Sequence, residues 1–137
     1  MTVLADTGVI VAAADRSEPR HNSCIQVLRA NHGQVVMTGP AVAESAWMIE
    51  SRLGPVAEAR FLRLVTTEEI SVADLSWDDY TRCIELIETY EDLGLGLVDA
   101  SIITVAERLG VVTLATLNHR DFAVVRPRHV AAFDLVP

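Results

Sequence analysis

Residues 2–8 read Thr-Val-Leu-Ala-Asp-Thr-Gly, a short and partly β-branched apolar run that stops at an acid and a turn. This pattern predicts a buried strand over residues 2–5 with Asp6 at its carboxyl end. A helix-compatible apolar run follows at residues 9–14. The start of the chain therefore predicts a strand–helix unit whose junction carries a carboxylate.

The same alternation continues to the end of the chain. Further strands are predicted at residues 34–38, 69–72, 111–115 and 130–136, and further helices at residues 20–31, 40–53, 56–65, 77–90 and 100–109. Residues 116–122 are predicted to be a polar loop. Strands that alternate with helices indicate a mainly parallel central sheet covered on both faces. We therefore expect one three-layer α/β/α domain spanning residues 1–137.

Composition limits the kinds of function that the chain can have. It has 137 residues, 50% hydrophobic, without an apolar run long enough to cross a membrane, so we expect a cytoplasmic protein with no membrane partner. The net charge of −8 argues against gripping nucleic acid by a general positive surface. It is compatible with a carboxylate cluster that binds divalent cations and with a basic protein partner.

Cysteine, histidine and tryptophan give weaker signals. Cys24 and Cys83 lie far apart without metal-ligand spacing, which predicts two buried reduced thiols. The four histidines show no ligand spacing and are expected at the surface. Trp47 and Trp77 lie in apolar helical patterns and are predicted to belong to the core or to a dimer interface.

Three acids lie in apolar sequence with no basic residue nearby: Asp6, Glu44 and Asp99. Buried carboxylates repel one another, so such a cluster must be protonated, paired with a cation or neutralised by a metal. A further acid, Asp121, follows the strand predicted at residues 111–115. Oxygen ligands without histidine or cysteine select Mg²⁺ or Mn²⁺, and such sites usually act on phosphate esters. Hydrolysis of a phosphodiester is the natural inference.

Each piece of this pattern has an alternative interpretation when taken alone. The triplet Asp6-Thr7-Gly8 is also found in aspartic proteases, although those are all-β proteins. A haloacid-dehalogenase-type phosphatase would have a second Asp where Gly8 stands. Glu44 in isolation is an ordinary exposed helix acid, and Asp99 is a possible helix N-cap, a role compatible with metal binding.

Four motifs in order along the chain give a more specific signal. They are Asp6-Thr7-Gly8, Pro40-x-x-x-Glu44, Leu95-x-x-Val98-Asp99-Ala100, and Thr-Leu-Asn-His-Arg-Asp-Phe at residues 116–122. Together they resemble the PIN-domain pattern of VapC-type toxins over nearly the whole chain. The resemblance implies a PIN fold and an Mg²⁺- or Mn²⁺-dependent endoribonuclease, the toxin of a type II toxin–antitoxin pair. It also implies a homodimer and a cognate antitoxin that occludes the site.

The resemblance also assigns roles to individual residues. Asp6, Glu44 and Asp99 would be the core metal-binding acids, and Thr7 and Thr116 would be supporting hydroxyls. The chain departs from the pattern at Asn118, where many relatives have Asp.

The identity of the fourth ligand therefore stays open. Either Asp121 completes the cluster or Asn118 contributes a neutral oxygen, and a second metal ion would then arrive with the RNA. Two other functions also remain: a PIN-like antitoxin-binding module that has lost catalysis, and a small-molecule phosphohydrolase.

Overall fold

The computed structural model describes all 137 residues and contains a five-stranded sheet in the order β3-β2-β1-β4-β5. The strands are β1 (Val3–Ala5), β2 (Val35–Thr38), β3 (Ile70–Ala73), β4 (Thr113–Ala115) and β5 (Asp134–Val136). Every neighbouring pair is parallel, and central β1 pairs Val3 with Val35 on one side and with Thr113 on the other. The expected parallel sheet is confirmed.

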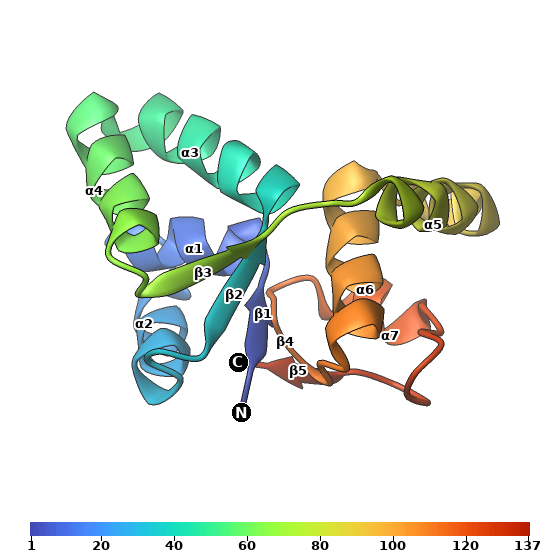
Figure 1. Ribbon diagram of the computed structural model, residues 1–137. Helices are drawn as coiled ribbons and strands as arrows, with labels where there is room; N and C mark the ends of the chain where they lie inside the picture. Colours follow the sequence, from blue (N-terminus) through green and yellow to red (C-terminus); the bar gives the residue numbers. More distant parts are fainter.

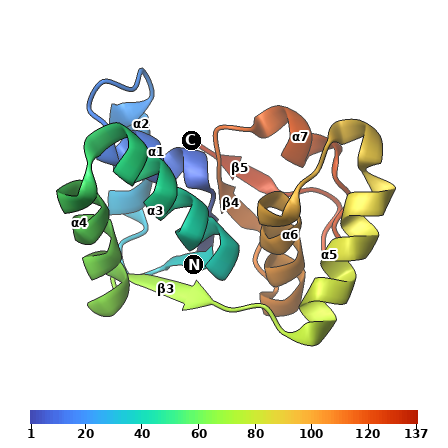
Figure 2. The same ribbon diagram turned by 90° about the horizontal axis from the view of Figure 1, so that it is seen from above.

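Helices cover both faces of this sheet, as Figures 1 and 2 show, so the three-layer α/β/α prediction is also confirmed. One layer holds α1 (Thr7–Ala14), α2 (His21–Ala30), α3 (Gly39–Leu53) and α4 (Pro55–Thr66). The other holds α5 (Trp77–Thr89), the short 3₁₀ helix Glu91–Leu93, α6 (Leu97–Leu109) and α7 (His119–Val124).

The central strand shows how the sequence divides its apolar residues between two cores. Val3 and Ala5 face the core under α1–α4, whereas Leu4 faces the core under α5–α7. This follows from the two-residue period of a strand, which sends successive side chains to opposite faces. A strand buried on both faces needs the continuous apolar run that opens the chain.

Polar caps fix the helix starts on the side of the sheet where the strands end. The Thr38 side chain accepts from the Ala41 backbone N–H at the start of α3, with Pro40 in the first turn. Ser76 and Asp79 form a reciprocal capping box at the start of α5, the helix predicted from residue 77. Gly94, in the turn before α6, has φ of 69°, a value that favours glycine.

Two segments near the end of the chain differ from the prediction. The polar loop expected at residues 116–122 contains the start of α7, because the Asn118 side chain caps a helix too short to show apolar periodicity. The strand expected at residues 130–136 forms only at residues 134–136. The preceding segment is held elsewhere, since Arg128 N donates to Glu107 and His129 hydrogen-bonds to the Val111 carbonyl.

Some helix faces were also predicted wrongly. The apolar spacing of Ala59, Leu62 and Val65 in α4 predicts that Leu62 points inward, but the buried residue is Phe61 and Leu62 is exposed. Trp47 and Trp77 are 68% and 87% exposed, so neither belongs to the core of this chain. Both sit on amphipathic helices whose opposite faces already fill the two cores.

Both cysteines are free and buried, as predicted. No helix of the structure combines the length and the hydrophobicity that a membrane span requires.

Candidate active site

Three acidic residues from three different elements meet at the carboxyl-terminal edge of the sheet. Asp6 directly follows β1, Glu44 lies in the second turn of α3, and Asp99 lies in the first turn of α6. All three line one hollow of about 470 Å³, which Thr7, Gly8, Met48, Gly94 and residues 96–98 complete. In open α/β sheets this edge is where ligands bind.

Asp6 is held in place by donors from two elements. One of its oxygens accepts from the Thr7 backbone N–H at 2.8 Å, so Asp6 is the N-cap of α1, and the other accepts from Thr116 Oγ1 at 3.0 Å. Burial raises the pKa of Asp6 despite these hydrogen bonds, and the charge of Glu44 adds to the rise. Asp6 is thus oriented but not charge-compensated.

Asp99 has the most perturbed carboxyl of the site. Burial raises its pKa to about 6, and the charges of Asp6, Glu44 and Asp121 contribute to that rise. A carboxylate in the first turn of a helix is ordinarily stabilised by the helix dipole, so at Asp99 burial and repulsion outweigh the dipole. The N-cap of α6 is Gly96, so the interpretation of Asp99 as an N-cap is wrong.

Glu44 is exposed, contrary to the expectation that its apolar surroundings would bury it. The next residue, Ser45, and Ile49 face the core, which leaves Glu44 on the side of α3 that borders the hollow. Its charge nevertheless reaches both other acids, because it raises the pKa of Asp6 and of Asp99.

The two candidates for the fourth position are bound to each other. Asn118 Nδ2 donates to one oxygen of Asp121 at 3.0 Å, and Asn118 Oδ1 accepts from the Asp121 backbone N–H at 3.3 Å. Arg120 Nε lies 3.2 Å from the other Asp121 oxygen. These contacts hold the pKa of Asp121 low, with the bond from Asn118 contributing most. Neither residue lines the hollow, although the charge of Asp121 reaches Asp99.

The two threonines expected to support the site have different surroundings. Thr116 donates to Asp6 and accepts from the Asn118 backbone N–H at 3.0 Å, so it links the first acid to the start of α7. Thr7 Oγ1 is buried without a hydrogen-bond partner, and Thr7 lines the hollow. An unpaired buried hydroxyl is costly unless a ligand or water completes it.

The chemistry of the residues that line the hollow shows whether it suits a metal ion. None of them is Arg, Lys or His, so the carboxylates have only one another as charged neighbours in the hollow. No three Asp, Glu, His or Cys side chains converge as a ready ligand shell. The all-oxygen donor set and its uncompensated charge nevertheless fit a hard divalent cation, which would draw mutually repelling side chains together.

Sequence reasoning missed part of the site. Gly94 and Gly96 line the hollow, whereas their spacing in the sequence predicts only a turn before the helix at residues 100–109. The contact between Thr38 and Ser101, two buried hydroxyl residues, had no recognisable signal, because it joins residues that are distant in sequence.

Comparisons with known proteins agree with this architecture. The model of the family described as "PIN domain" matches residues 3–126. Ribonuclease VapC26 of Mycobacterium tuberculosis is 25% identical over 135 residues, which cover 98% of this chain and the whole of that protein.

Solved structures of the same fold include toxins and toxin–antitoxin complexes. Mycobacterium tuberculosis VapC20, a toxin that cleaves the sarcin–ricin loop, superposes with a TM-score of 0.81 and 14% identity over 87% of this chain and 92% of its own. A toxin–antitoxin complex from Klebsiella pneumoniae superposes with a TM-score of 0.71 and 22% identity, covering 99% of this chain and 97% of its own.

Proposed function

The chain belongs to the PIN-domain family, and on that premise we propose that it is an Mg²⁺- or Mn²⁺-dependent endoribonuclease, the toxin of a type II toxin–antitoxin pair. One observation carries the proposal: Asp6, Glu44 and Asp99 line the same hollow with no cationic side chain among them. A folded protein keeps such a repulsive arrangement where a cation or a reaction uses it. Relatives named as ribonucleases and toxins support the choice of reaction.

The roles of the residues follow from their surroundings. Asp6, Glu44 and Asp99 would hold the metal ion, which when bound supplies an acidified water and neutralises charge on the phosphate. Thr116 and the Thr7 backbone N–H orient the Asp6 carboxylate. Asp99, with a pKa of about 6, gives up its proton to solvent as the pH rises above that value, so both metal affinity and cleavage should increase over the same range.

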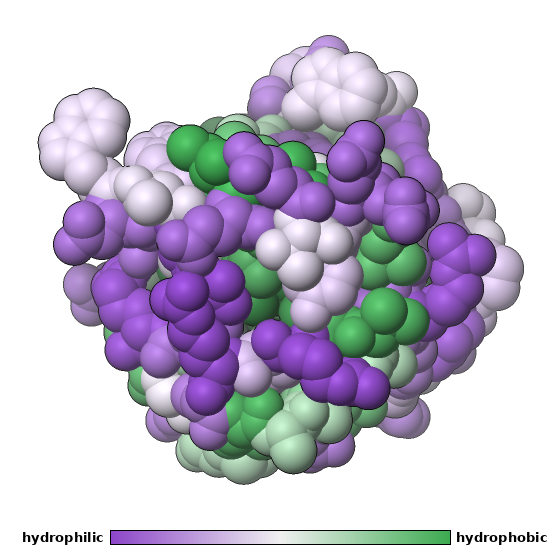
Figure 3. Space-filling model, turned by 90° about the vertical axis from the view of Figure 1, so that its right-hand side faces the viewer, coloured by the Kyte–Doolittle hydropathy of each residue, from purple (hydrophilic) through white to green (hydrophobic).

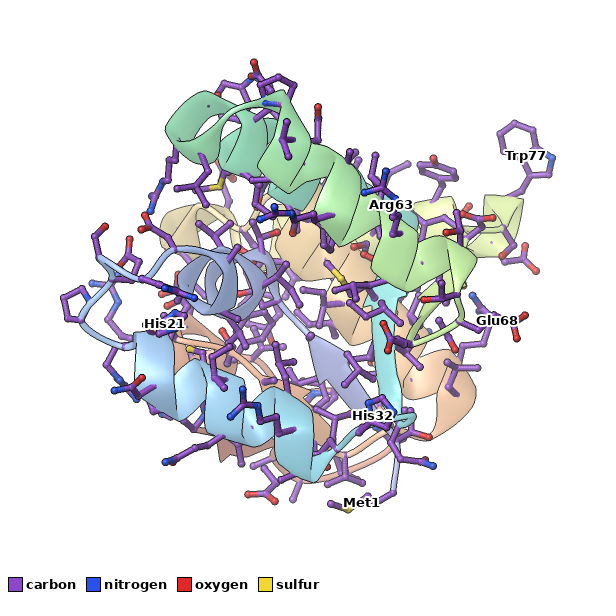
Figure 4. All side chains as sticks on the ribbon, turned by 90° about the vertical axis from the view of Figure 1, so that its left-hand side faces the viewer. Met1, His21, His32, Arg63, Glu68 and Trp77 are labelled. Carbon is purple, nitrogen blue, oxygen red and sulfur yellow. The ribbon has the colours of Figure 1, made fainter.

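We propose a cognate antitoxin as the protein partner, and an apolar groove on the α1–α4 layer supports this. Residues of α1, α2 and α4, including Ile10, Leu28, Phe61 and Leu64, line a groove of about 340 Å³. Figure 4 looks onto this side of the molecule, with α2 below, α4 above and α1 between them. An apolar groove of this kind fits an amphipathic helix.

A second, basic hollow adjoins the groove and shares Ala13, Ala14, Ile25 and Arg60 with it. Arg16 and Arg29 also line it, and these two arginines and Arg60 make no ion pair within the chain. Acidic residues flanking the apolar face of an antitoxin helix would complement it.

We propose a homodimer as the state of the free protein, and the exposed apolar side chains of α5 support it. Trp77, Tyr80 and Ile84 lie three and four residues apart on this helix and are 87%, 43% and 56% exposed. Figure 3 shows the side of the molecule that carries α5–α7, where hydrophobic patches lie among hydrophilic residues. Exposed aromatics of this kind are typical of interfaces.

The direct test is incubation of purified, antitoxin-free protein with total cellular RNA and Mg²⁺ or Mn²⁺. We expect discrete products that disappear with EDTA and with Asp6→Asn. Intact RNA together with measurable metal binding would favour the antitoxin-binding module. Hydrolysis of a small phosphoester without RNA cleavage would favour the phosphohydrolase.

A further inference from the structure

A buried chain of hydrogen bonds joins the helix that carries Glu44 to the helix that carries Asp99. The Ala41 backbone N–H donates to Thr38 Oγ1 at 3.2 Å, Thr38 Oγ1 lies 2.8 Å from Ser101 Oγ, and Ser101 Oγ lies 2.6 Å from the Val98 carbonyl oxygen. Thr38 and Ser101 are both fully buried. They are 63 residues apart in sequence, so no local turn requires this contact.

The direction of each bond follows from the chemistry of its ends. The Val98 carbonyl can only accept, so Ser101 uses its single hydroxyl proton there. The Thr38 hydroxyl must then donate to Ser101, while Thr38 Oγ1 accepts from Ala41. Each hydroxyl thus donates once and accepts once, in the order Ala41 N–H, Thr38 O–H, Ser101 O–H, Val98 C=O.

The two ends of this chain lie next to the acids of the site. Ala41 is three residues before Glu44 in the first turns of α3, and Val98 directly precedes Asp99 in α6. Thr38 is also the last residue of β2, the strand beside β1, whose end carries Asp6. A shift at either hydroxyl would therefore move one acid relative to the others.

We propose that Thr38 and Ser101 are positioning residues that set the separation of Glu44 and Asp99. The charges of Glu44 and Asp99 repel each other, so the two helix starts need a restraint against moving apart. A hydrogen-bond chain in a water-free interior is stronger than one at the surface, and water cannot replace its members. This inference rests on the proposed metal site, because it concerns how closely two of the proposed ligands are held before the ion binds.

The proposal is tested with the variants Thr38→Val and Ser101→Ala, and the protein offers a matched control for each. Thr104 is another buried hydroxyl residue of α6, but its Oγ1 lies 3.5 Å from Cys83 Sγ and faces α5, away from the site. Thr104→Val therefore matches Ser101→Ala as the loss of a buried hydroxyl. Ser76→Ala matches Thr38→Val as the loss of a helix cap.

The experiment is calorimetric titration with Mn²⁺ of the metal-free full chain, these four single variants, the double variant of Thr38→Val with Ser101→Ala, and Thr38→Ser. We expect Thr38→Val and Ser101→Ala each to raise the dissociation constant about tenfold, as the loss of residues that orient metal ligands typically does. Their double variant should be little weaker than either single variant, because both break one chain. Thr38→Ser, which keeps the hydroxyl, should bind nearly as the wild type does. Thr104→Val and Ser76→Ala should stay within about twofold of the wild type.

Hydrogen exchange on the metal-free protein keeps the inference separate from the proposed function. Thr38→Val and Ser101→Ala should each speed exchange at both helix starts, residues 39–44 and 97–101, whereas Thr104→Val should affect only the α5–α6 contact. Wild-type protein that binds no Mn²⁺ would contradict the proposed metal site. The exchange result would still show whether the Thr38–Ser101 hydrogen bonds hold the two helix starts together. Exchange confined to the mutated helix, or Mn²⁺ affinities equal to those of the controls, would overturn the inference.

Discussion

The two ends of α6 carry carboxylates in opposite electrostatic states. Asp99, in the first turn, lines the hollow with other acids, and burial and repulsion raise its pKa to about 6. Glu107, near the last turn, accepts from Arg82 at 2.8 and 2.9 Å and from the Arg128 backbone N–H at 2.7 Å. Burial opposes its ionisation, but these donors hold the pKa of Glu107 below its ordinary value.

The helix dipole alone would lower the pKa of Asp99 and raise that of Glu107, because it favours an anion at the start of a helix and disfavours one at the end. The neighbours therefore decide the outcome. Acids that the fold uses for stability have arginine partners, and the acids of the hollow have none. The difference separates a structural carboxylate from a candidate ligand on the same helix.

The largest expected difference between the two ends is in catalysis. Asp99→Asn should lower RNA cleavage roughly 10³-fold, the equivalent of about 4 kcal/mol of transition-state stabilisation, because it removes a proposed metal ligand. Glu107→Gln should leave the cleavage rate within about threefold of the wild type. Rates measured under single-turnover conditions on one RNA substrate check this, and equal losses in the two variants would contradict it.

The free energy of unfolding should depend on Glu107, the acid that catalysis does not need. Glu107→Gln leaves the largely buried Arg82 with only the more exposed Glu85 as an ion-pair partner and should lower the free energy of unfolding by about 2 kcal/mol at pH 7. The lowered pKa of Glu107 means that its contribution is present above the unfolded pKa and is lost as the pH falls through the folded pKa. Urea unfolding at pH 7 and at a series of acidic pH values should show the full effect at pH 7 and a progressively smaller one as the pH falls.

The fourth position should have an intermediate effect on catalysis. Asp121→Asn should lower cleavage about tenfold or less, because the Asp121 oxygens are already engaged by Asn118 and Arg120 while its charge still reaches Asp99. A loss as large as that of Asp99→Asn would instead make Asp121 a core ligand. Arg120→Ala, which removes the neighbouring cation and leaves the acid, is the matched control.

The smallest expected effect is a gain in stability at the site. The raised pKa of Asp99 means that its ionised form weakens the metal-free fold at neutral pH, and the penalty is relieved as the pH falls through about 6 toward the unfolded value. Asp99→Asn should therefore stabilise the metal-free protein by about 1 kcal/mol at pH 8, a figure discounted for solvent screening. At pH 4 the gain should vanish, and thermal unfolding in EDTA at both pH values measures it.

The fold could be predicted from the sequence wherever burial imposed a clear period. The apolar run at residues 2–5 and the strong apolar pattern of residues 100–109 fixed a central strand and a central helix, and both lie where expected. The errors fall where a side-chain contact overrides the local pattern. The cap from Asn118 creates α7, and the contacts of Arg128 and His129 shorten the last strand.

The three acids of the hollow could be found from the sequence because each stands out against apolar neighbours. The surroundings of these acids could not be predicted from the sequence. Glu44 is exposed on its helix, and Asn118 and Asp121 are tied to each other, features that depend on the direction of side chains in space. The Thr38–Ser101 contact depends on two elements 63 residues apart and leaves no local pattern.

The most direct test of the proposed metal site is a calorimetric measurement, at pH 7.5, of Mn²⁺ binding to the wild-type, Asp99→Asn and Glu107→Gln proteins. Asp99→Asn should lose most of its affinity, while Glu107→Gln should bind as the wild type does despite its lower stability. Equal Mn²⁺ binding by all three proteins would contradict the claim that the uncompensated acids of the hollow, with Asp99 among them, form the metal site.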